Sequence, residues 1–168
     1  NSLFRKRNRD FCFVAIKNGY QASIMAPTAI LASQHYEELS KYFNKLNMSV
    51  ELITSSNTKK QKQDIANRLK EGKIDILFGT HKLLNDKVEF KDLGLLVIDE
   101  EQRFGVVHKE KIKKYKASVD VLTLSATPIP RTLKMAMSGL RDLSILDTAP
   151  AFRYPIQTYV AEENDFLI

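Results

Sequence analysis

An unbroken aliphatic run that ends abruptly in acidic residues constrains this chain more than any other feature. The run Leu95–Ile98 contains only leucine, valine and isoleucine, and it is followed directly by Asp99, Glu100, Glu101 and Gln102. Such a run is typical of a strand buried on both faces of a parallel sheet, a layer that cannot accommodate carboxylates. We therefore expect the acidic residues to emerge at the carboxyl edge of the sheet, where open α/β sheets bind ligands.

Two neighbouring carboxylates at such an edge suit nucleotide hydrolysis. Asp99 can hold Mg²⁺ through water, and Glu100 can orient a second water for attack on a phosphoryl group. The alternative is an ordinary strand followed by a solvated acidic turn. The other strand ends of the chain favour the first interpretation.

The pattern of the whole chain predicts an α/β fold with a mainly parallel central sheet and helices on both faces, because apolar runs alternate with helical patterns. Strands are predicted over 22–26, 49–53, 74–78, 93–98, 119–124 and 144–146, and helices over 29–44, 58–71, 103–116 and 130–137. Thr58 is expected to cap the second helix and Gly72 to end it. In the first helix the candidate inward positions are Ile30, Leu31, Tyr36, Leu39 and Phe43.

Length and composition bound the class of protein. A chain of 168 residues suits one domain, predicted over 1–147, and the proline-interrupted stretch 148–168 resembles a truncated linker towards a further domain. A net charge of +6 permits a polyanionic partner. The lone Cys12 has no disulfide partner within the chain, and no apolar segment approaches the length of a membrane span. We expect a cytoplasmic protein without membrane contact.

Four short loops, each after a predicted strand, carry the functional argument. They are Ala-Pro-Thr at 26–28, Gly-Thr-His at 79–81, Asp-Glu-Glu-Gln at 99–102 and Ser-Ala-Thr at 125–127. Each is common alone. In this order they resemble the motifs of the first RecA-like domain of superfamily 2 helicases and translocases, which implies a three-layer RecA-like sandwich. The stretches 79–84, 99–106, 127–133 and 135–144 resemble the bacterial transcription-repair coupling factors, and RecG-type branch-migration helicases are close relatives of these.

The resemblance implies an ATP-dependent motor that tracks along double-stranded DNA and displaces stalled RNA polymerase, which it would contact through other domains. It implies ATP with Mg²⁺ as cofactor, Asp99 as the residue holding the metal through water, and Glu100 as the residue polarising the attacking water. Coupling of hydrolysis to movement falls to Gln102, Ser125 and Thr127. The residues implied to face DNA are Pro27, Thr28, Gln34, Gly79, Thr80 and His81.

Each of these residues also has a plainer role. Thr28 can simply cap the helix that follows Pro27, and Gln34 and His35 can form no more than its polar face. His81 is one of three histidines and lacks the partners of a metal site.

The first twelve residues depart from the family pattern. A Gly-x-x-x-x-Gly-Lys-Thr phosphate loop is expected ahead of Asn18, yet residues 1–12 contain no glycine. Without the nest of backbone N–H groups that such a loop provides, we predict little or no ATP hydrolysis by this chain alone. Two alternatives to a coupling-factor motor therefore stay open: a RecG-type branched-DNA helicase domain, and a non-hydrolysing DNA- or protein-binding module with the same fold.

Overall fold

A computed structural model of the chain describes residues 2–84, 88–105, 107–108, 110, 112 and 118–125, with the backbone alone over 2–7. The labelled helices of this part are α1 (Ser2–Lys17), α2 (Ala29–Lys45) and α3 (Lys59–Lys70), with short 3₁₀ turns η1 (His81–Leu84) and η2 (Glu101–Arg103), and residues 107, 108, 110 and 112 are helical as well. The strands are β1 (Gln21–Met25), β2 (Val50–Ile53), β3 (Ile76–Gly79), β4 (Leu93–Asp99) and β5 (Asp120–Leu124). The predicted elements over 130–137 and 144–146, and the domain boundary near 147, lie outside the described residues.

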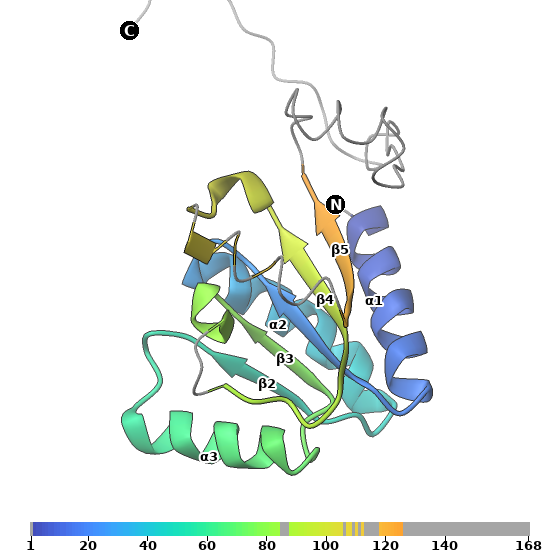
Figure 1. The fold of residues 1–168 in the computed structure, drawn as a ribbon. Helices are drawn as coiled ribbons and strands as arrows, with labels where there is room; N and C mark the ends of the chain where they lie inside the picture. The colour runs from blue at the N-terminus through green and yellow to red at the C-terminus, as the bar shows by residue number, and fades with distance from the viewer. Residues whose placement is uncertain are drawn as a thin grey trace, which may run out of the picture.

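The strands form one sheet in the order β2-β3-β1-β4-β5, and every pair of neighbours is parallel. The predicted parallel α/β sheet is therefore confirmed. Figure 1 shows the strand tips pointing towards one end of the molecule, with α2 passing behind the sheet. Parallel neighbours require crossover connections, which α2 and α3 supply in the described part of the chain.

Helices cover both faces of the sheet, and the strand residues alternate between them. On one face, Leu95 and Val97 of β4 pack in a core cluster with Cys12 of α1 and with Leu39 and Phe43 of α2. The opposite cluster receives the alternate residues of β4, the buried residues of α3, and apolar residues that follow β3 and β4: Leu96, Ile98, Ile65, Leu69, Leu83 and Phe104. This alternation follows from the two-residue period of a strand. It explains why the run 95–98 within β4 has to be apolar at every position.

Local signals set the helix ends. Thr58 caps α3 by accepting a hydrogen bond from the Gln61 backbone N–H at 3.2 Å, and the Gln61 side chain accepts one from the Thr58 N–H at 2.8 Å. Gly72 follows the helix in the left-handed conformation, with φ of +77°. Both predicted signals are confirmed, and reciprocal bonds of this kind satisfy N–H groups that the first turn leaves without partners.

Two predictions about helices were wrong. Ile30 was predicted to point inward, but 73% of it is exposed. The buried residues of α2 include Ala32, Leu39 and Phe43, and Ile30 lies about 200° around the helix from Ala32 at roughly 100° per residue. The helix predicted over 103–116 does not begin at Arg103, because η2 ends there and Phe104 has an extended backbone that places its ring in the core. The described residues 107, 108, 110 and 112 of that range are helical, so only the predicted start is wrong.

Candidate functional site

The carboxyl edge of the sheet brings together the strand ends that the sequence singled out. Met25 of β1 pairs with Gly79 of β3 and with Ile98 of β4, and Asp99 pairs with Leu124 at the end of β5. The loops that follow these strands therefore leave the sheet at the same edge. Thr127, predicted to lie there too, is outside the described residues.

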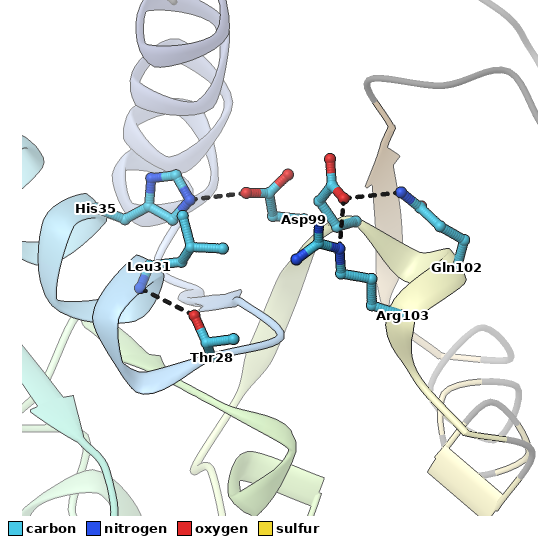
Figure 2. A network of polar contacts seen from close by, with 7 residues as sticks. Thr28, Leu31, His35, Asp99, Gln102 and Arg103 are labelled. Carbon is cyan, nitrogen blue, oxygen red and sulfur yellow. Dashed lines mark hydrogen bonds and ion pairs between the residues drawn. The ribbon is translucent and has the colours of Figure 1, made fainter. Parts of the chain in front are cut away.

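Asp99, the last residue of β4, contacts α2 through His35. His35 Nε2 donates a hydrogen bond to Asp99 Oδ2 over 2.9 Å, as Figure 2 shows. Nε2 is the donor because a carboxylate only accepts. The two side chains are 13% and 14% exposed, so water has little access to this contact. Sequence reasoning placed His35 on the polar face of its helix, and no local pattern indicated a contact with Asp99.

Glu100 is held from the other direction, by η2. Its carboxylate Oε2 accepts from Gln102 Nε2 at 2.9 Å and lies 3.0 Å from Arg103 Nε. Its backbone is left-handed, with φ of +53°, and its N–H donates to the Leu124 carbonyl at 2.9 Å. A left-handed non-glycine residue costs about 1–3 kcal/mol and often occurs at functional sites. At this left-handed residue the chain leaves β4 and enters η2.

Gln102 links two of the predicted site residues. While its amide nitrogen donates to Glu100, its Oε1 accepts from Ser125 Oγ at 3.2 Å. The end of β4 is thereby connected to the end of β5 through one side chain. The structure therefore brings Glu100, Gln102 and Ser125 into one polar network.

The predicted DNA-facing residues occupy two places on this edge. Thr28 precedes α2 and caps it, accepting a hydrogen bond from the Leu31 N–H at 3.3 Å, while Gln34 is exposed nearly two turns further along the helix. After β3, Thr80 is buried and His81 is exposed. Packing explains why residue 79 is a glycine, since a Cβ there would lie 2.7 Å from the Ile53 carbonyl oxygen.

His81 stacks beside His108, with ring centroids 4.7 Å apart and planes tilted by 51°. Partial burial lowers the pKa of His81 below its ordinary value, and the neighbouring His108 and Lys82 lower it further. This lowering favours the neutral ring of His81, in which one nitrogen donates a hydrogen bond and the other accepts one.

The acidic side of the site fits a hydrated magnesium ion, whereas the described residues contain no glycine-rich loop for the phosphates of a nucleotide. Within the described residues, no group of three or more His, Cys, Asp or Glu side chains could hold a metal ion. Mg²⁺ needs fewer, because one or two carboxylates with water and phosphate oxygens suffice. The N-terminal end of α1 lies towards the same end of the molecule as the strand tips (Figure 1). Helix α1 begins at Ser2 and residues 1–18 contain no glycine, so this segment supplies no glycine-rich phosphate loop.

Comparison with known proteins now decides the family. A family model for the DEAD/DEAH box helicase matches residues 8–136. The chain belongs to the DEAD/DEAH box helicase family. The predicted resemblance to superfamily 2 motors is thereby confirmed. Among the described residues of this helicase-family chain, no helix is long and apolar enough to cross a membrane.

The relatives narrow the resemblance further. Over 156 residues, 93% of this chain, the sequence is 54% identical to the transcription-repair-coupling factor of Bacillus subtilis strain 168 and 51% identical to that of Escherichia coli K12. The chain spans only 13% and 14% of these two proteins.

Two solved helicases share the fold. A structure of RecG bound to a three-way DNA junction matches with 41% identity and a TM-score of 0.64, covering 83% of this chain and 18% of that one. The helicase Lhr of Mycobacterium smegmatis, bound to single-stranded DNA and AMP-PNP, matches with a TM-score of 0.60 at 13% identity, covering 81% of this chain and 19% of that one. The RecA-like α/β fold expected from the sequence is confirmed.

Proposed function

We propose that this chain is part of the motor of an ATP-dependent translocase that moves along double-stranded DNA and, as a longer protein, displaces stalled RNA polymerase in transcription-coupled repair. The observation that carries the proposal is the meeting of Asp99, Glu100, Gln102 and Ser125 at one sheet edge, in a chain 54% identical to a transcription-repair-coupling factor. A net charge of +6 suits a polyanionic track. RNA polymerase would be bound by other parts of the longer protein, in the cytoplasm.

In that longer protein Asp99 would hold Mg²⁺ through water and Glu100 would orient the attacking water. Bound magnesium neutralises charge that develops on the phosphates. Gln102 suits a coupling role because it joins Glu100 to Ser125, and Thr127 is proposed to act with them. If Asp99→Asn and Glu100→Gln left the ATPase turnover of the longer protein intact, these roles would be wrong.

DNA would run along the loops after β1 and β3, where backbone N–H groups and small hydroxyls can bind phosphates without reading bases. The residues proposed for this surface are Pro27, Thr28, Gln34, Gly79, Thr80 and His81.

Duplex binding can be tested with a matched pair of substitutions. Gln34 of α2 and Gln63 of α3 are both exposed helical glutamines, and only Gln34 belongs to the proposed DNA surface. A carboxylate placed 4 Å from a phosphate costs about 1 kcal/mol in water, so we expect Gln34→Glu to weaken duplex binding roughly fivefold. Gln63→Glu should leave it nearly unchanged. Fluorescence anisotropy with two duplexes of unrelated sequence measures both; equal losses would contradict the proposed surface.

The chain alone should turn over little or no ATP, because no glycine precedes Gly19. A coupled phosphate-release assay, with and without duplex DNA, measures this. DNA-stimulated turnover above that of Glu100→Gln would refute the expectation.

Two alternatives rest on particular observations. The 41% identity to RecG favours a branched-DNA helicase, and the missing glycine loop favours a non-hydrolysing module. In the longer protein, release of stalled polymerase would support the coupling-factor proposal, whereas junction regression without polymerase release would support the first alternative.

A further inference from the structure

Each of the two site carboxylates is held by a different element. Figure 2 shows His35 on one side of Asp99, and Gln102 and Arg103 on the other. Asp99 is bonded from α2 through His35, whereas Glu100 is bonded from η2.

We propose that His35 is the positioning residue for Asp99: by binding Oδ2 it fixes the carboxylate in the orientation that receives a hydrated divalent cation. The inference rests on the proposed function, since it takes Asp99 as the metal-binding residue. Carboxylates that bind metals are commonly oriented by hydrogen bonds from a second residue, and loss of such a partner costs about 10–100-fold in metal affinity.

His35 is suited to this task because α2 is fixed at several points. Leu39 and Phe43 of the same helix are buried against the sheet, and Thr28 caps its first turn. A donor carried by a packed helix has little freedom to follow a moving carboxylate, so it fixes the carboxylate instead. The contact is also mostly excluded from water, which strengthens a hydrogen bond to a charged group.

The contact also ties the acidic pair to the proposed DNA surface. His35 lies two helical turns after Thr28 on the same helix. If contact at Thr28 moved α2, His35 would move with the helix, and its hydrogen bond would move the Asp99 carboxylate.

The test uses Mn²⁺ alone as a probe of the intact chain, with no nucleotide. Paramagnetic broadening of backbone amide signals around Asp99 gives a site-specific affinity by NMR. We expect His35→Leu to weaken it about tenfold or more. His35→Gln, whose amide nitrogen can still donate to the carboxylate, should restore it to within about threefold of the original chain. Asn44→Leu makes the same kind of change at an exposed position of α2 and should have no effect.

Each result has a definite meaning. Unchanged Mn²⁺ affinity in a folded His35→Leu chain would overturn the inference, as would a His35→Gln chain that binds as weakly as His35→Leu. Should His35→Leu fail to fold, judged by circular dichroism, the glutamine variant decides alone: retained affinity supports positioning, and a tenfold loss refutes it. The variant Asp99→Asn tests the metal role of Asp99 separately from the positioning role of His35. If it binds Mn²⁺ as tightly as the original chain, the metal role in the proposed function fails, and the inference fails with it.

Discussion

Replacing Asn8 should stabilise this protein. Asn8 lies on α1 and is fully buried, and among the residues that the structure describes neither its side-chain nitrogen nor its oxygen has a hydrogen-bond partner. It sits one turn before Cys12, which faces the apolar cluster shared by α1, α2 and the sheet, and positions four apart share one face of a helix. The amide is therefore directed into an apolar layer without compensation.

The size of the effect follows from that burial. An unsatisfied buried polar group costs about 1–3 kcal/mol. Leucine has the same branched shape without the polar atoms, and it is the better helix former by a few tenths of a kcal/mol. Taking about 2 kcal/mol for Asn8→Leu, the melting temperature should rise by roughly 4–8 °C in a chain of this size.

Urea denaturation followed by circular dichroism gives the free energy of unfolding directly. Asn8→Ala removes the same polar atoms without adding volume and should give a smaller gain. Asn44→Leu, at an exposed position of α2, should change stability by less than about 0.5 kcal/mol. Unchanged or reduced stability in both Asn8 variants would show that the amide has a partner, such as a buried water, and would refute the reasoning.

Two further predictions concern titratable groups. Burial raises the pKa of the Cys12 thiol to about 12, so we expect no reaction with a disulfide reagent at pH 8 until the chain is unfolded in urea, and rapid labelling of the native chain would contradict this. The pKa of His81 is lowered by partial burial and by His108 and Lys82, whereas DNA phosphates favour the protonated ring, so duplex affinity should rise as pH falls from 7 through that lowered pKa. His81→Asn should flatten the pH profile measured by anisotropy, and an unaltered profile would exclude His81 from the contact.

Much of the fold could be predicted because its signals are local. The continuous apolar run of β4 requires burial on both faces, and the acidic residues after it mark the edge. Thr58 with Gln61 three residues later is a capping pattern readable from four letters of sequence. The inward position predicted for Ile30 was wrong because the apolar residues of α2 alone did not determine which side of the helix faces the sheet.

The contacts of the site were harder to predict because they join distant segments. His35 and Asp99 are 64 residues apart, and the sequence contains no signal for the place of α2 relative to the end of β4. The left-handed turn at Glu100 was equally unpredictable, since nothing in a glutamate favours positive φ. Both features depend on the assembled sheet.

In the first turns of α1, the feature that lowers stability and the feature that limits phosphate binding are different. The same short segment lacks the glycines of a phosphate loop and carries the buried amide without partners, while the acidic network at the ends of β4 and β5 is complete in the described residues. Packing and phosphate binding depend on different atoms there: Asn8 is buried in the core, whereas a cradle around a triphosphate needs the converging backbone N–H groups that a glycine-rich turn presents. Asn8→Leu should therefore raise the melting temperature without creating ATPase turnover. If turnover did appear in that variant, poor packing of α1, and not the missing cradle, would be the cause of inactivity.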